Sequence, residues 1–166
     1  QGGHASLFAG LLARRYAPEL DLLGVAAAAP ATDLTGMVHQ PAGTVMRGQI
    51  LPAMVFSADL SFTWTQDIST VEPWRTFIAN NMPGILPADV PVLLAQGEAD
   101  ATVRPETTAA YMQRLCKAGG KVRGILMPGI DHHFIAHKSA DQAVQWMDDR
   151  FAGKPAPNDC PRSTTG

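Results

Sequence analysis

The sequence lacks an excess of positive charge and lacks any long apolar run. Its 13 Lys and Arg residues are outnumbered by 15 Asp and Glu residues, which gives a formal net charge of -2. Electrostatic binding to nucleic acid or to an anionic membrane needs a basic patch, so we expect no nucleic-acid partner and no polybasic membrane patch. No uninterrupted apolar run reaches the ~18 residues that a transmembrane helix needs, so we expect no transmembrane segment.

The sequence also lacks a recognisable metal or nucleotide motif. No G-x-x-x-x-G-K-[ST] phosphate loop is present, and Gly119-Gly120 is better explained as the end of a helix. A zinc site needs a second, distant pair of ligands, which is missing beside the one local group of candidates: Asp131, His132, His133 and His137. We therefore expect no cofactor and no metal.

Apolar runs and helical patterns alternate along most of the chain. Short apolar runs at residues 22–28, 90–95 and 122–127 each end near glycine or proline, as buried strands do. Helical spacing covers residues 3–16, 105–119 and 139–153, and Ser139 with Gln142 forms a capping-box pattern. This alternation predicts an α/β fold with a parallel sheet of about three strands and flanking helices.

The middle of the chain, from about residue 32 to 88, follows no single period. It is too apolar for a disordered linker and too long for a simple connection. We expect a helical cap inserted at residues 36–88, between core segments 1–35 and 89–166; the alternative is a small satellite domain that only packs. The large apolar residues here are Met37, Met46, Met54, Phe56, Phe62, Trp64, Trp74, Phe77 and Met82.

An acid and a histidine follow two successive predicted strands. Asp100 lies in the turn after the second strand, and His132 lies in the turn after the third. The carboxyl ends of parallel strands meet at one edge of a sheet, where chemistry collects in open α/β folds. An acid beside an imidazole can fix its tautomer, so that the ring takes a proton from a serine and returns it to a leaving group.

Other residues compete for these roles. His133 is the alternative base, because neighbours in a loop point in different directions, and Glu98 is the alternative acid, since it lies nearer the strand end. The remaining candidates have simpler explanations. Asp131 is explained as an exposed loop carboxylate, and His137 as a solvated or capping histidine. His4 is explained as a packed histidine, and Asp33 as a helix cap.

The first four residues, Gln1-Gly2-Gly3-His4, precede a helix and have the form of the second half of a nucleophile elbow. The attacking serine is then expected immediately before Gln1, and Gly2 is expected to let the strand and helix pack closely. The order Ser, Asp, His is the order of the catalytic residues in α/β-hydrolases.

Taken together, these segments resemble secretory lipases of the α/β-hydrolase fold, the family that includes the fungal lipase A enzymes. The matching segments are spread over nearly the whole chain, and their order and spacing make the resemblance specific. They are Gln1-Gly2-Gly3-His4-Ala5, residues 24–34, Gly97-Glu98-Ala99-Asp100, Pro128-Gly129-Ile130-Asp131-His132 and residues 146–155.

The resemblance implies specific roles for individual residues. Asp100 is implied as the triad acid, His132 as the triad base, and the backbone N–H of Gln1 as half of an oxyanion hole. The serine and the other half are then expected upstream. It also implies a disulfide between Cys116 and Cys160, hence an oxidising compartment and a secreted protein; two unrelated thiols are the alternative.

The expected function is a secreted lipase or esterase that cleaves carboxylic esters through an acyl-enzyme, with the cap as lid and acyl-binding wall. The expected partners are an ester or lipid substrate, a transient lipid interface, and the N-terminal part of the same protein. By itself this chain is expected to be inactive, with an apolar sheet edge that promotes association. The alternatives are hydrolysis of another acyl bond, as in a polyester or peptide, and a non-catalytic fragment or binding module.

Overall fold

In the computed structural model, which describes residues 1–40 and 67–161, three parallel strands form one sheet. The strands are β1 (Val25–Ala28), β2 (Val92–Gly97) and β3 (Val122–Met127), in the spatial order β1-β2-β3. Pairing of β2 starts later than the apolar run because Pro91 has no N–H to donate and the N–H of Val90 bonds the carbonyl of Pro87. The predicted α/β fold with three parallel strands is confirmed.

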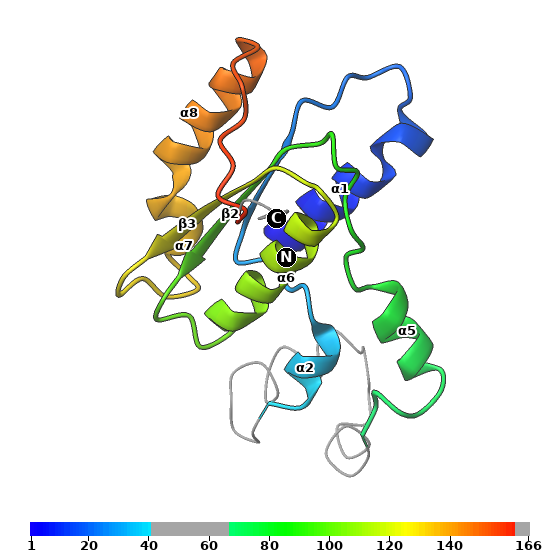
Figure 1. Ribbon diagram of the computed structural model, residues 1–166. Helices are drawn as coiled ribbons and strands as arrows, with labels where there is room; N and C mark the ends of the chain where they lie inside the picture. Colours follow the sequence, from blue (N-terminus) through cyan, green and yellow to red (C-terminus); the bar gives the residue numbers. More distant parts are fainter. Residues whose placement is uncertain (41–66, 162–166) are drawn as a thin grey trace, which may run out of the picture.

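Helices cover both faces of the sheet, as Figure 1 shows. Helices α1 (Gly2–Tyr16) and α6 (Pro105–Lys117) pack on one face through Leu7, Tyr111 and Leu115. Helix α8 (Ala140–Phe151) packs on the other face through Trp146. Every residue of β2 is buried, so this strand forms the centre of a three-layer core.

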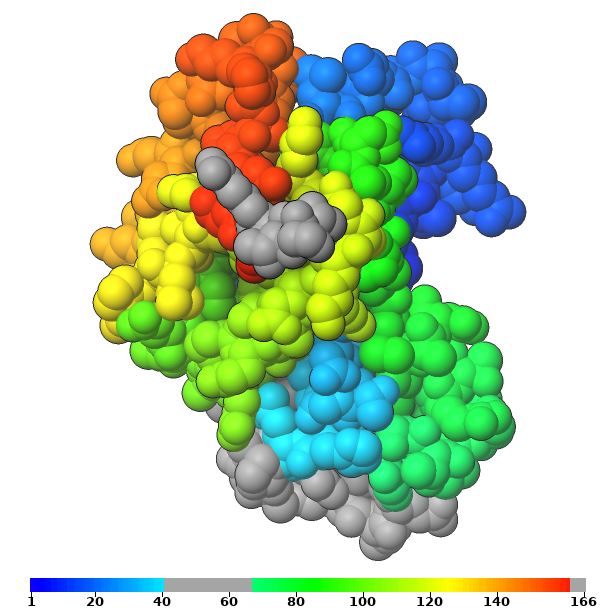
Figure 2. All heavy atoms as spheres, in the orientation of Figure 1, coloured from blue at the N-terminus to red at the C-terminus, as the bar shows by residue number. Residues whose placement is uncertain are grey.

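Two further helices, α2 (Leu34–Val38) and α5 (Trp74–Asn80), contact one another at one end of the molecule (Figure 2). Helix α2 crosses the expected boundary at residue 35. Their buried residues belong to the same core cluster as Ala29, which follows β1, and Val103, which follows β2. These helices therefore pack beside the carboxyl ends of the strands. Five apolar residues of the expected cap lie outside the described residues: Met46, Met54, Phe56, Phe62 and Trp64.

Helix α7 (Ile135–Lys138) leads directly into α8, so Ser139 does not begin a separate helix as its capping-box pattern predicted. Ser139 already has near-helical dihedral angles, φ -92° and ψ -2°, and its side chain does not cap α8. Its hydroxyl instead donates to the carbonyl of Ile135 at 2.8 Å. The capping-box prediction is wrong because a serine within continuous helical turns bonds backward along the chain.

Close packing of α1 against β1 depends on Gly3. A Cβ atom at Gly3 would overlap the backbone of Ala28, the last residue of β1, whereas a Cβ atom at Gly2 would meet nothing within 4 Å. The sequence predicted that Gly2 allows the close packing of strand and helix, but the structure requires the glycine at position 3. The start of α1 lies against the carboxyl end of β1 as a result.

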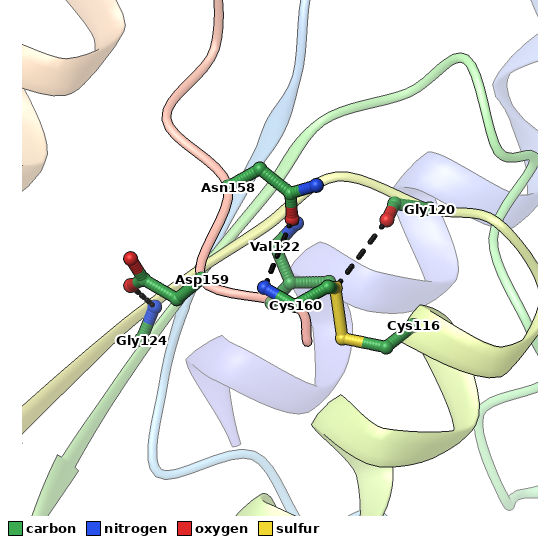
Figure 3. Close-up of a disulfide and its surroundings, with 7 residues drawn as sticks. All are labelled: Cys116, Gly120, Val122, Gly124, Asn158, Asp159 and Cys160. Carbon is green, nitrogen blue, oxygen red and sulfur yellow. Dashed lines mark hydrogen bonds between the residues drawn. A yellow bond between two sulfur atoms is a disulfide. The ribbon is translucent and has the colours of Figure 1, made fainter. Parts of the chain in front are cut away.

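The C-terminal tail covers the outer edge of β3 (Figure 3). A disulfide joins Cys116, at the end of α6, to Cys160 in the tail, with 5.4 Å between the Cα atoms. Next to it, Asn158 Oδ1 accepts the N–H of Val122 at 3.2 Å, and Asp159 Oδ2 accepts the N–H of Gly124 at 2.9 Å. The predicted disulfide is present, and the tail occupies backbone donors that an edge strand otherwise leaves open.

None of the helices in the described ranges is long and apolar enough to cross a bilayer.

Substituting Gly3 by alanine should destabilise the protein, because the added methyl group must displace the backbone of Ala28. We expect a loss of about 1–3 kcal/mol, the usual range for overpacking. Gly2→Ala is the matched control, and it should be neutral or slightly stabilising because alanine favours the helix. Thermal unfolding followed by circular dichroism measures both, and equal melting temperatures for the two variants would contradict the packing argument.

Removing the disulfide by Cys160→Ser should lower the free energy of unfolding by up to about 4 kcal/mol, the chain-entropy value for a loop of this length. The sequence separation is 44 residues. Hydrogen exchange at the N–H groups of Val122 and Gly124 should rise as well, because the tail is released from β3. Asp159→Asn keeps the disulfide and is the control for the tail contacts alone. Unchanged exchange at both N–H groups would show that the disulfide does not hold the tail in place.

Candidate functional site

Asp100 lies in a buried turn directly after β2. Only 3% of its surface is exposed, so its charge must be satisfied within the protein. Its Oδ1 atom accepts the backbone N–H groups of Thr102 at 2.9 Å and Val103 at 2.8 Å. The turn thus fixes one carboxylate oxygen and directs the other away from it.

That second oxygen, Oδ2, lies 2.8 Å from Nδ1 of His132. The turn after β2 and the turn after β3 therefore bring together the predicted acid and the predicted base. The His132 side chain is 28% exposed, so its ring is open to solvent on part of its surface. An imidazole that donates from Nδ1 to a carboxylate has Nε2 available as a proton acceptor.

The pairing of β2 and β3 continues into these two turns and holds them in register. The N–H of Glu98 donates to the carbonyl of Met127, and the N–H of Ala99 donates to the carbonyl of Ile130, both at 3.0 Å. Gly97 is needed here because a Cβ atom would overlap the carbonyl of Ile130. The glycine three residues before Asp100 therefore permits the close approach of the two turns.

The surroundings of Asp100 act in opposite directions on its pKa. Burial raises the pKa, but hydrogen bonds from His132 and from the N–H groups of Val103 and Thr102, with the charge of His132, outweigh it. The pKa is therefore below the ordinary value of 3.8. Asp100 is ionised at neutral pH and stabilises an imidazolium at His132.

The competing residues lie in different surroundings. The His133 side chain is 78% exposed, and its Nδ1 is 4.0 Å from Asp131 Oδ1. Asp131 Oδ1 accepts the N–H groups of His133 and Phe134, so it stabilises the turn. Glu98 is exposed. The structure thus joins Asp100 to His132, and neither alternative residue takes part in that pair.

The remaining candidates have the structural environments that the sequence suggested. His4 Nε2 lies 2.7 Å from the carbonyl of Asn81, and the His4 ring packs against Phe8. Asp33 caps α2 by accepting the N–H of Gly36 at 2.9 Å. His137 is exposed on α7.

Gln1 lies at the start of α1, and its carbonyl accepts the N–H of Ala5 at 2.9 Å. Because Gly3 contacts the end of β1, this helix begins at the same edge of the sheet as the turns of Asp100 and His132. Ala29, directly after β1, adopts a positive φ of 40°, an uncommon conformation for a residue with a side chain. Such outliers are concentrated at functional sites.

A group of serine, histidine and aspartate side chains lies near α2, and sequence reasoning did not find it. His39 Nε2 is 3.0 Å from Asp67 Oδ2 and 3.2 Å from Ser69 Oγ, while Ser69 Oγ donates to Asp67 Oδ1 at 2.6 Å. The hydroxyl of Ser69 and then His39 lower the pKa of Asp67 to about 2. A proton relay needs the acid and the hydroxyl on different ring nitrogens, so this group is an exposed hydrogen-bond cluster.

Sequence reasoning also missed Gln96, whose side-chain amide contacts Asp100. Its Nε2 donates to Asp100 Oδ2 at 3.2 Å. The available signal was a polar residue at the end of a buried strand, immediately before the Gly-x-x-Asp turn. Within the described ranges, no group of three or more His, Cys, Asp or Glu residues could hold a metal ion.

Comparison with known proteins gives one family match. A sequence model of the family described as secretory lipase matches residues 1–61 and 53–159. No curated protein matches the sequence.

Two solved structures of Candida antarctica lipase A are similar to the chain. The structure described as the closed state has a TM-score of 0.65 at 14% identity. The match covers 99% of this chain and 52% of that structure's chain. The other has a TM-score of 0.71 at 14% identity, with 48% of its length covered by 96% of this chain. The chain thus spans about half the length of these structures, and at this identity the similarity shows the fold alone.

The Asp100 carboxylate should make folding stability depend on pH. Its pKa is lower in the folded state than the ordinary 3.8, so its ionised form stabilises the fold. Asp100→Asn should lower the melting temperature most at neutral pH, and the difference from the wild type should shrink as the pH falls through the folded-state pKa. Glu98→Gln, at an exposed carboxylate, is the control. A constant difference between Asp100→Asn and wild type from pH 7 to 3 would contradict the assignment.

Proposed function

The chain belongs to the secretory lipase family, and we propose that it carries the acid and base of a serine hydrolase that cleaves carboxylic esters. The observation that supports this most directly is the hydrogen bond between Asp100 and His132. The acid is buried and the histidine is partly exposed. This is the arrangement in which an imidazole can exchange a proton with a substrate.

In the proposed reaction, Asp100 holds His132 with its proton on Nδ1, so that Nε2 accepts the proton of the attacking serine hydroxyl. The serine oxygen forms a bond to the ester carbonyl carbon. His132 then returns the proton to the leaving alcohol as the carbon–oxygen bond breaks, which leaves an acyl-enzyme. Water repeats the sequence and releases the acid. Asp100 remains ionised and stabilises the imidazolium that forms in each step.

The proposed position of the serine is immediately before Gln1. The contact of Gly3 with the end of β1 supports this position, because it brings the start of α1 to the edge that carries Asp100 and His132. Helix α1 has 15 residues, and the partial positive charge at a helix N-terminus favours a developing oxyanion. The backbone N–H of Gln1 is the proposed donor to that oxyanion.

We propose that helices α2 and α5 belong to the lid and acyl-binding wall. Their core cluster is continuous with residues at the strand ends and includes Met37 and Ile78, and the partly buried side chains of Trp74 and Met82 pack against it. A wall of this kind suits an acyl chain, which binds by burial of apolar surface. The disulfide and the family both support secretion, since disulfides persist in oxidising compartments.

Replacing His132 in the complete protein should abolish most ester hydrolysis. We expect His132→Asn to lower kcat by on the order of 10³-fold or more, because the proton acceptor is lost. His133→Asn is the matched control, and it should retain nearly full activity because its ring does not contact Asp100. Initial rates on p-nitrophenyl esters measure both, and a larger loss in His133→Asn would reassign the base.

A fluorophosphonate probe should label the complete wild-type protein at the residue before Gln1, as peptide mass spectrometry would locate it. Labelling should slow strongly in His132→Asn. An adduct on a residue elsewhere in the protein would overturn the proposed position of the nucleophile.

A further inference from the structure

Gln96 connects the predicted acid to helix α6 through an enclosed polar network. The residue is 3% exposed and lies in β2, immediately before Gly97. Its Nε2 atom donates to Asp100 Oδ2 at 3.2 Å, and its Oε1 accepts the hydroxyl of Thr108 at 2.6 Å. Thr108, on α6, is 5% exposed. Buried polar groups are costly unless each has a partner, and in this network they do.

The orientation of the amide follows from its neighbours. Besides Asp100 Oδ2, Nε2 lies 3.1 Å from the carbonyl of Gly97 and 3.0 Å from the carbonyl of Val103. All three neighbours are acceptors, so a nitrogen must face them. The hydroxyl of Thr108 can donate to the amide oxygen on the opposite side. Thr108 therefore fixes the direction in which Gln96 presents its hydrogens.

We propose that Gln96, oriented by Thr108, is a positioning residue that holds the carboxylate of Asp100 in place for its hydrogen bond with His132. This inference rests on the proposed function of the Asp100 and His132 pair. The N–H groups of Thr102 and Val103 bind only Oδ1. Gln96 is the donor that constrains Oδ2, the oxygen that His132 uses.

The amide has an electrostatic effect as well as a geometric one. Its hydrogens carry partial positive charge beside Oδ2, so they weaken the attraction of the carboxylate for an imidazolium at His132. Two titratable residues of the same turn also lie beside His132: His133, with ring centroids 6.3 Å apart, and Asp131, the preceding residue.

The central experiment replaces Gln96 by methionine in the complete protein, since methionine has similar length and no amide. We expect the pKa of His132, measured by NMR titration without substrate, to rise by about 0.5 to 1 pKa unit, the equivalent of one hydrogen bond. The acidic limb of the kcat/KM profile should move up by the same amount. At its optimum, kcat should fall roughly 3- to 10-fold with little change in KM.

Thr108 provides variants that leave Gln96 in place. Thr108→Val removes the hydroxyl and should shift the pKa of His132 in the same direction, whereas Thr108→Ser keeps the hydroxyl and should restore the wild-type value. Thr32→Val is the matched control, because Thr32 is also buried and donates to the carbonyl of Thr107 at 3.3 Å, outside this network. Thr32→Val should change stability without changing the pKa of His132.

The NMR readout separates this inference from the proposed function. If the wild type hydrolyses no ester but the pKa of His132 still shifts in Gln96→Met and Thr108→Val, the positioning role stands and the proposed substrate class is wrong. An unchanged pKa in Thr108→Val would overturn the positioning role, even where Gln96→Met fails to fold. A shift of equal size in Thr32→Val would overturn it too, because the effect would then be one of general packing.

Discussion

Burial of β2 on both faces is the constraint from which the site follows. A strand in the middle of the sheet, with α6 on one side and α8 on the other, has almost no room for unpaired polar groups. The chemistry must therefore lie beyond the strand end, where Gly97 lets the chain turn beside Ile130. Gln96 is the exception inside the strand, and it is accommodated because both ends of its amide have partners.

The same parallel pairing explains why an acid and a histidine 32 residues apart meet. Residues of β2 and β3 are in register up to Gly97 and Met127, and backbone hydrogen bonds continue the register into the two turns. The position of His132 relative to Asp100 is thus set by the backbone rather than by the two side chains. The pair of His39 and Asp67 differs, because both side chains are exposed and because Asp67 and Ser69 both contact the same ring nitrogen of His39.

The two edges of the sheet differ. On β3, the tail and its disulfide occupy the outward donors of Val122 and Gly124, so this edge is partly closed. On β1, no strand among the described residues pairs with the outer side. The chain covers about half of each lipase A structure that it matches. Helix α1, before which the nucleophile is proposed, contacts β1.

Local sequence patterns were enough to predict the three strands, the helices α1, α6 and α8, and the turns that hold Asp100 and His132. Those features depend on hydrophobic period and on glycine and proline, which are properties of neighbours in the chain. The choice of Gly3 over Gly2, the backward bond of Ser139, and the contact of Gln96 with Asp100 could not be predicted in this way. Each depends on how closely two segments approach in space, which is decided only when the helices pack on the sheet.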